Sequence, residues 1–422
     1  MRFESEEERR PSSGRCDLAG MTDGDRTVTD TTVAFYSHDT YGLGHLRRTL
    51  LLAHALQNRW PGLSQLIVTG SPLAHGFPLP PGADYEKLPS VVKVGRDRYQ
   101  PSALPIPFEA VRALRRDLLL ATADHVRPDL FVVDNVPAGL EGEIVPALLH
   151  LKRASPRTRF VLGLRDIVDA AVQVRTTWRR QAVYELLDDV YHLILVYGDR
   201  TVCDVVDEYG LSQGAAAKTR YVGYLRRQPD AARAAELRAE LRACGRPLVL
   251  ATAGGGADGH ELLQTLLEAR RRWPRDADFD CIVVPGPFAA PRERQALAEL
   301  AENGSRARLI DFDPDLPAYM AASDAVVSMA GYNSICEIAS VGRPAVLVPR
   351  VRPRQEQLLR ARAATSRGVG RMIHPSELTP SRLLAEVNAL LDRPPCDPMS
   401  LPLTGLVGAS QEIEALLDRR AA

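Results

Sequence analysis

The sequence predicts an α/β protein of two domains, each built on an open, doubly wound parallel sheet. Short β-branched and aliphatic runs such as TVAFYS and DLFVVDN alternate with amphipathic helical stretches, which is the rhythm of strand–helix–strand units in a parallel sheet. This alternation of strands and helices is interrupted once, by the polar, Pro-bounded segment 226–247, and then resumes. A chain of 422 residues has the length that two such domains need.

The domain boundaries follow from that break. We expect a disordered leader over residues 1–30, Rossmann-like domains over 31–225 and 246–400, a linker over 226–245 and a carboxyl-terminal helix over 401–422. The leader is charged, contains Pro, Ser and Gly, and has no apolar core, as disordered segments do. Because ligands of open parallel sheets bind beyond the carboxyl ends of the strands, we expect the two domains to face each other across a ligand-binding cleft.

The composition disfavours several classes of protein. The formal net charge is zero, so no global positive field attracts nucleic acid. The longest apolar runs are too short for a transmembrane helix. The six cysteines are widely spaced, without a C-x-x-C pair or a histidine spacing typical of zinc. We therefore expect a cytoplasmic protein that binds no nucleic acid and no metal.

The strongest motif is G-Y-N-S-I-C-E, residues 331–337. A strand ends at Gly331, and Asn333 and Ser334 are residues that favour the start of a helix. The free backbone N–H groups and the dipole of such a helix start form a site for a pyrophosphate. Glu337 follows at about 5–6 Å along the helix axis, where its carboxylate is placed to accept hydrogen bonds from a ribose diol.

Two further loops follow strands of the same domain. After the strand AVLVPR come Glu356 and Gln357, and a carboxylate beside an amide is suited to bind vicinal sugar hydroxyls. After the strand LVLAT come Gly254, Gly255 and Gly256, which let the backbone approach a phosphate closely. This glycine run is not a P-loop, because no Gly-Lys-Ser/Thr follows it. A plain tight turn is the alternative.

The loop after the first strand of the chain contains Gly42, Gly44 and His45. Arg47 stands where a dinucleotide fingerprint has its third glycine, and no acidic residue ends the next strand, so NAD and FAD are disfavoured. His45 is placed at the start of a helix that faces the cleft, and a neutral imidazole there is able to take a proton from an attacking hydroxyl. The alternative is a structural histidine that stabilises the loop.

Two more acidic residues end strands of the first domain. Asp134 precedes Asn135, and Asp166 follows Arg165. Both pairs are predicted to face the acceptor, that is, the molecule whose hydroxyl attacks. Asp134 and Asp166 are the replacement candidates for the catalytic base if His45 is structural. The alternative for both pairs is an ordinary surface loop.

The motifs together resemble a known family. The pattern G-Y-N-S-x-x-E, followed by G-x-P, V-P and E-Q-x-x-x-A, is similar to the donor-binding box of GT-B glycosyltransferases. That group includes natural-product transferases and the family 28 enzymes that make lipid II. The resemblance implies a GT-B fold, with Gly254–Gly256 and Gly331–Ser334 on the donor diphosphate, Glu337 on the ribose, and Glu356 and Gln357 on the sugar. Met329 departs from the pattern, because plant members carry a histidine there.

The resemblance implies a glycosyltransferase that moves a sugar from a nucleoside-diphosphate donor, most simply a UDP-sugar, with inversion. The acceptor is a small molecule or a lipid-linked compound, and neither a metal nor another cofactor is expected. One alternative is a nucleotide-sugar hydrolase, because the pattern from Gly42 to Ala53 is also similar to hydrolases of pseudaminic-acid biosynthesis, in which His45 would activate water. A second alternative is a non-catalytic nucleotide-sugar-binding protein.

Overall fold

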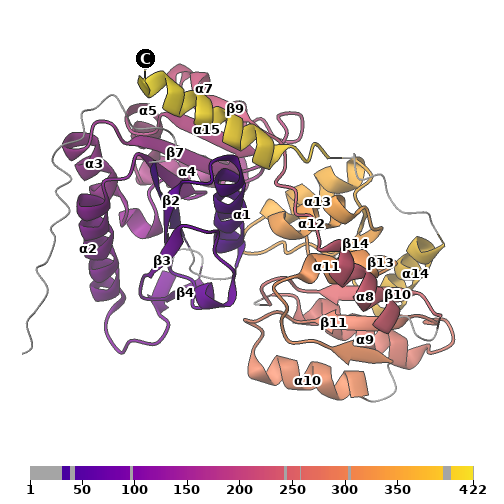
Figure 1. Ribbon diagram of the computed structural model, residues 1–422. Coiled ribbons are helices and arrows are strands. Elements are labelled where there is room, and N and C mark those ends of the chain that lie inside the picture. Colours follow the sequence, from indigo (N-terminus) through magenta and orange to yellow (C-terminus); the bar gives the residue numbers. More distant parts are fainter. Residues whose placement is uncertain are drawn as a thin grey trace, which may run out of the picture.

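The computed structural model describes residues 31–38, 43–95, 98–241, 245–256, 258–302, 306–392 and 401–421. The leader 1–30 and Gly42 lie outside the described residues. The described chain forms two α/β domains that lie side by side, the first in indigo to magenta and the second in orange (Figure 1).

The first domain is built on a seven-stranded, wholly parallel sheet in the order β3-β2-β1-β6-β7-β8-β9. Its strands are β1 (Thr32–Ser37), β2 (Ser64–Thr69), β3 (Ala83–Lys87), β6 (Leu130–Asp134), β7 (Arg159–Arg165), β8 (Leu193–Tyr197) and β9 (Thr219–Tyr221). Its helices are α1 (Gly44–Arg59), α2 (Phe108–Val126), α3 (Val145–Ala154), α4 (Ala171–Arg180), α5 (Val183–Asp189), α6 (Val205–Tyr209) and α7 (Gln213–Ala217). An antiparallel hairpin of β4 (Val91–Gly95) and β5 (Arg98–Pro101) stands apart from this sheet.

The second domain repeats the design with a six-stranded parallel sheet in the order β12-β11-β10-β13-β14-β15. Its strands are β10 (Leu248–Thr252), β11 (Asp280–Val284), β12 (Ala307–Leu309), β13 (Ala325–Ser328), β14 (Ala345–Leu347) and β15 (Arg371–Met372). Its helices are α8 (Ala231–Leu241), α9 (His260–Arg272), α10 (Pro291–Glu302), α11 (Leu316–Ala322), α12 (Tyr332–Val341), α13 (Glu356–Ser366) and α14 (Pro380–Leu391). The predicted fold class, two Rossmann-like domains, is confirmed.

The central strand β1 shows how the sheet divides the core. Val33 and Phe35 pack on one face, and Ala34 and Tyr36 pack on the other, as the alternation of side chains along a strand requires. The face with Phe35 is covered by α1, and its apolar core continues through α11 and α12 of the second domain. The two domains are thus joined by a shared hydrophobic core as well as by the chain itself.

The segment predicted as a linker is largely helical. Within 226–245, helix α8 packs against α11, and Arg238 donates a hydrogen bond to the carbonyl of Ala322 at 2.8 Å and pairs with Asp324 at 3.1 Å. The segment from α8 onward is therefore part of the second domain. The polar, Ala- and Arg-rich composition that suggested a linker is that of a helix that buries only a narrow stripe.

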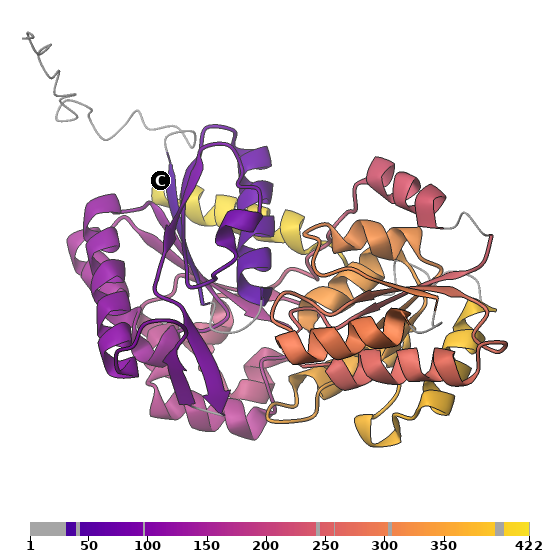
Figure 2. The ribbon, with the colours of Figure 1, turned by 90° about the horizontal axis from the view of Figure 1, so that it is seen from below.

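The carboxyl-terminal helix α15 (Gly405–Ala421) crosses back to the first domain, where it lies along α1 (Figure 1; Figure 2 shows the same crossing from below). Arg59 near the end of α1 pairs with Glu414 at 2.9 Å. At the entry to α15, the backbone N–H of Tyr224 donates to the carbonyl of Pro402 at 2.7 Å. The chain therefore crosses between the domains twice, at residues near 225 and again before α15.

Candidate active site

The predicted donor residues meet in a cleft of 210 Å³ between the two domains. The first domain contributes Leu43, Gly44, Arg47, Arg48, Phe77 and Arg165 to its lining. The second contributes Gly254, Gly255, Gly256, Gly331, Tyr332, Asn333, Ser334, Glu356 and Gln357, among others. Only Glu337, among the ten predicted donor residues, lies behind this lining. The carboxyl ends of parallel strands in both sheets therefore face the same space.

Helix α12 begins one residue earlier than the sequence predicted. Gly331 is its N-cap (φ −64°, ψ 150°) and makes no side-chain capping bond, so Asn333 and Ser334 lie in the first turn instead of capping it. The side-chain amide of Asn333 donates across the cleft to the carbonyl of Gly44 at 3.4 Å. The first backbone N–H of this helix with a partner in the described structure is that of Ile335. The preceding N–H groups are therefore open to an anion in the cleft.

The glycine loop after β10 needs its glycines. Gly254 and Gly256 have positive φ angles of 65° and 91°, and a Cβ on Gly256 would lie 2.5 Å from the carbonyl oxygen of Pro285. No other residue fits there without strain. The loop consequently presents backbone rather than side chains to the cleft beside Met329, whose thioether is at most a weak hydrogen-bond acceptor.

Glu337 is 2% exposed, and two arginines already occupy one of its oxygens. Arg47, from the first domain, forms a very short ion pair with Oε1, and Arg227 pairs with the same oxygen at 3.1 Å. The second oxygen, Oε2, is buried and has no hydrogen-bond partner in the described part of the chain. A buried acceptor without a partner is costly, so Glu337 has an unused capacity to bind a donor hydroxyl.

Glu356 and Gln357 begin α13 and are both held by Arg350. The Arg350 guanidinium pairs with Glu356, and the backbone N–H of Arg350 donates to Oε1 of Gln357 at 3.1 Å. Burial acts to raise the pKa of Glu356, but Arg350 and Arg165 outweigh it and hold the pKa below its usual value. Glu356 is therefore a carboxylate, and its Oε2 also lacks a partner among the described residues.

His45 and Asp134 form a direct pair. Nδ1 of His45 lies 2.6 Å from Oδ2 of Asp134, and the same carboxylate accepts two hydrogen bonds from Arg48 at 2.6 and 3.1 Å. Burial acts to raise the pKa of Asp134, but Arg48 and His45 hold it below its usual value. The sequence indicated both residues as alternatives for one role, yet they act on each other. The ionised Asp134 orients the His45 ring and leaves Nε2 for another partner.

His38, at the end of β1, is a residue that the sequence analysis missed. It is 6% exposed and lines another cavity of 280 Å³, which is lined mainly by the first domain, with Asn135 and Trp178, and also by Arg354 of the second domain. Its ring meets that of His45 edge-on at 5.4 Å. Burial and the nearby His45 ring lower the pKa of His38 well below its usual value, so it is neutral. The sequence feature that could have indicated His38 was its position at the end of a strand, two residues beyond the buried Tyr36.

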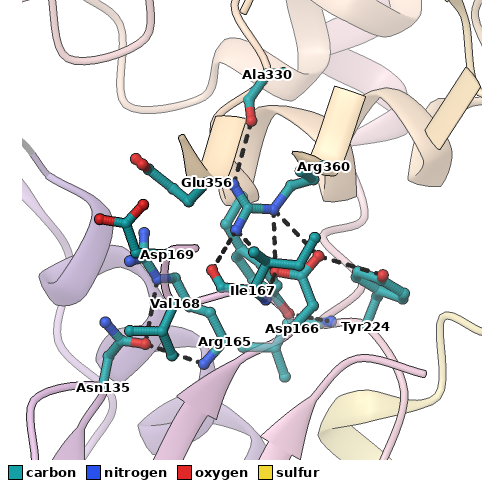
Figure 3. Close-up of polar contacts among 12 residues, drawn as sticks. Asn135, Arg165, Asp166, Ile167, Val168, Asp169, Tyr224, Ala330, Glu356 and Arg360 are labelled. Carbon is teal, nitrogen blue, oxygen red and sulfur yellow. Dashed lines mark hydrogen bonds and ion pairs between the residues drawn. The ribbon is translucent and has the colours of Figure 1, made fainter. Parts of the chain in front are cut away.

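Asp166 lies in a closed environment. Arg360 of α13 donates three hydrogen bonds of 2.9 to 3.1 Å to its two oxygens, and the Tyr224 hydroxyl donates another at 3.3 Å (Figure 3). Asp166 is 1% exposed and does not line the cleft. These surroundings favour a role in holding the two domains together over the role of a replacement base.

No helix in the described ranges has the length and apolar character that crossing a bilayer requires. No group of three or more His, Cys, Asp or Glu side chains is arranged to hold a metal ion in that same part of the chain.

Residues 249–400 match the model of the glycosyltransferase family 28 C-terminal domain. A relative from Brucella anthropi, a UDP-N-acetylglucosamine–N-acetylmuramyl-(pentapeptide) pyrophosphoryl-undecaprenol N-acetylglucosamine transferase, is 29% identical over 141 residues. That alignment spans 33% of this chain and only 38% of the relative. The family-model match thus lies in the second domain.

Solved structures extend the similarity to the whole chain. The calicheamicin glycosyltransferase CalG4 superposes with a TM-score of 0.56 at 18% identity, covering 92% of this chain and 98% of that one. TcCGT1, solved in complex with UDP, gives a TM-score of 0.60 at 12% identity, covering 93% of both chains. Identities this low establish the fold alone. The protein therefore has the GT-B fold of glycosyltransferases. Within that class, its second domain resembles the glycosyltransferase family 28 C-terminal domain.

Proposed function

We propose that this protein transfers a sugar from a nucleoside-diphosphate donor, a UDP-sugar, to a hydroxyl group of an acceptor, with inversion at the anomeric carbon. The observation that carries the proposal is the pair of His45 and Asp134, whose Nδ1 and Oδ2 atoms are 2.6 Å apart. His45 directly follows Gly44, which lines the cleft together with the residues predicted to bind the donor. The similarity of the second domain to family 28 supports the donor half.

The chemistry follows from the positions of these groups. Because Nδ1 of His45 donates to Asp134, Nε2 carries the lone pair that takes the acceptor proton. The acceptor oxygen then bonds to the anomeric carbon from the face opposite the diphosphate. The bond from that carbon to the diphosphate oxygen breaks, and its electron pair stays on the oxygen. The free N–H groups at the start of α12 stabilise the charge that develops there.

The acceptor is proposed to bind against the first domain. The 280 Å³ cavity lined by His38, Asn135 and Trp178 lies next to His45, because the His38 and His45 rings are in contact. The Brucella relative is named for a pyrophosphoryl-undecaprenol acceptor. The acceptor of this chain is accordingly proposed to be a hydroxyl compound, either free or linked to a lipid.

The first test measures UDP released from UDP-sugars with and without a panel of acceptors. A glycosyltransferase should release UDP only slowly in water and much faster, with formation of a glycoside, when its acceptor is present. Release at one full rate regardless of acceptor would identify the protein as a nucleotide-sugar hydrolase instead. Tight UDP-sugar binding without any turnover would identify a binding protein.

The second test is the substitution His45→Ala. General-base catalysis contributes about 10²–10⁴-fold, so kcat should fall by about that factor with little change in UDP affinity. His45→Gln keeps the size and one hydrogen bond of the imidazole. If His45→Gln retains most of the activity, His45 is a structural residue and the role of base moves to Asp134, the carboxylate beside it.

The third test removes divalent ions with EDTA. The rate should stay unchanged, because helix N–H groups rather than a metal are proposed to stabilise the leaving diphosphate. A loss of activity with EDTA that Mg²⁺ or Mn²⁺ restores would contradict this part of the mechanism.

A further inference from the structure

Arg165, at the carboxyl end of β7, differs from the other arginines of the cleft. The remaining cleft-lining arginines each pair with a carboxylate: Arg47 with Glu337, Arg48 with Asp134, Arg350 with Glu356, and Arg360 with Asp166. In the described structure, the guanidinium of Arg165 bonds only to the neutral amide oxygen of Asn135, at 3.2 Å from Nε (Figure 3). Among the described residues that line the cleft, Arg165 is thus the one arginine without a carboxylate partner.

Asn135 holds this arginine in a defined direction. It is 4% exposed and adopts a positive φ of 61°, a conformation that asparagine tolerates better than most residues. Its Oδ1 accepts hydrogen bonds from both the backbone N–H of Arg165, at 3.1 Å, and its Nε. The two terminal nitrogens of the guanidinium have no protein partner in the described ranges. They form the planar fork that binds a phosphate through two hydrogen bonds.

Burial and positive charge outweigh the negative charge around Arg165. Burial, together with the nearby Arg48 and Arg360, lowers the pKa of Arg165 to about 9, although Glu356 acts in the opposite direction. An arginine whose charge is disfavoured to this degree needs an anion more than an ordinary one does. The carboxylate of Glu356 is already paired with Arg350.

The opposite wall of the cleft shows where such an anion would lie. The second domain's side of the cleft includes the glycine loop Gly254–Gly256, the open N–H groups at the start of α12, and Met329. These groups offer hydrogen bonds but no free cation. Arg165 lines this cleft and is absent from the lining of the 280 Å³ cavity proposed for the acceptor, so it faces the donor side.

We propose that Arg165 binds the β-phosphate of the donor diphosphate, so that the first domain completes a phosphate site that the second domain only half forms. This inference rests on the proposed function. The β-phosphate is chosen because Arg165 interacts with Glu356, the carboxylate assigned to the sugar that this phosphate carries. When the bond from the sugar to the phosphate oxygen breaks, its electron pair stays on that oxygen, and Arg165 is placed to neutralise the added charge.

The test compares UDP with UMP, which lacks the β-phosphate. Isothermal titration calorimetry should show that Arg165→Gln weakens UDP binding by about 10–100-fold, the effect of losing charge-assisted hydrogen bonds. UMP binding should change by less than about 3-fold. Arg159→Gln, at the other end of the same strand and outside the cleft, is the matched control and should leave both affinities unchanged.

A second variant tests the same idea with Arg165 in place. Asn135→Asp supplies the missing carboxylate beside the guanidinium, and asparagine and aspartate both tolerate this backbone conformation. It should also weaken UDP more than UMP, with a thermal unfolding midpoint close to that of the wild type. Equal losses for UDP and UMP in both variants, or no loss for UDP, would overturn the assignment of Arg165. If the wild-type protein binds neither nucleotide, the proposed donor is wrong and the function fails instead.

Discussion

Two carboxylates, Asp166 and Glu337, form ion pairs between the domains, and their surroundings differ. Asp166 uses both oxygens, with Arg360 and Tyr224 as partners, and Arg360 in turn donates to the carbonyls of Ile167 and Ala330. Glu337 uses one oxygen for two arginines, Arg47 and Arg227, and leaves the other buried without a partner in the described residues. Both are buried to a similar extent, at 1% and 2% exposure.

The difference favours a structural role for Asp166 and a ligand-binding role for Glu337. A buried ion pair contributes to a defined arrangement only when its remaining hydrogen-bonding groups are satisfied, as they are around Asp166. A buried oxygen without a hydrogen-bond partner destabilises the folded protein, and such an oxygen is expected where a bound ligand supplies the missing partner. We therefore expect changes at Asp166 to affect stability, and changes at Glu337 to affect donor binding.

The largest effect is expected for Asp166→Ala. Arg360 is 2% exposed, and leaving such a buried cation unpaired costs about 3–5 kcal/mol of the free energy of unfolding. Urea denaturation followed by circular dichroism measures this loss. Asp117→Ala, which breaks an exposed pair with Arg116, should leave the unfolding midpoint unchanged. The double variant Asp166→Leu with Arg360→Met should recover most of the stability, and a failure of Asp166→Ala to destabilise would remove the contrast.

A smaller effect, on a different quantity, is expected for Glu337→Ala. UDP binding should weaken by about 1–3 kcal/mol, the value of charge-assisted hydrogen bonds to the ribose. The loss of stability should be smaller than that of Asp166→Ala, because Arg47 and Arg227 are 14% and 20% exposed and can turn toward solvent. Calorimetry with UDP measures the first quantity and urea denaturation the second. Unchanged UDP affinity in a folded Glu337→Ala protein would remove the ribose role.

The smallest effect, and one of opposite sign, is expected for Arg47→Met. Arg47 pairs with Oε1 and draws on the charge of the same carboxylate, so its removal should strengthen the hydrogen bond that Oε2 accepts from the ribose. UDP affinity should rise by about 2–5-fold, equivalent to roughly 0.5–1 kcal/mol. Arg59→Met breaks the exposed pair with Glu414 farther along the same helix and should leave UDP binding unchanged. A fall in affinity for Arg47→Met would show that Arg47 binds the donor directly.

That the residues predicted to bind the donor meet at one cleft was predictable, because each group of them is close in sequence. A strand followed by a helix places Gly331, Asn333 and Ser334 at one sheet edge whatever the rest of the chain does, and the same holds for Gly254–Gly256. The N-cap was misplaced by two residues, since Gly331 rather than Asn333 holds that position. Glycine is also a tolerated N-cap residue, so local preference alone does not decide between them.

The sequence by itself determined two doubly wound domains, the strands that carry the motifs, and the residue types at their carboxyl ends, because periodicity and loop chemistry are local properties. Only the tertiary structure decided which of these residues pair. It joined His45 to Asp134 across 89 positions of the chain and Arg360 to Asp166 across 194. It also left Arg165 without a carboxylate. Partner choice between charged side chains depends on distance and burial, which are set when the two sheets pack together and which a linear pattern does not record.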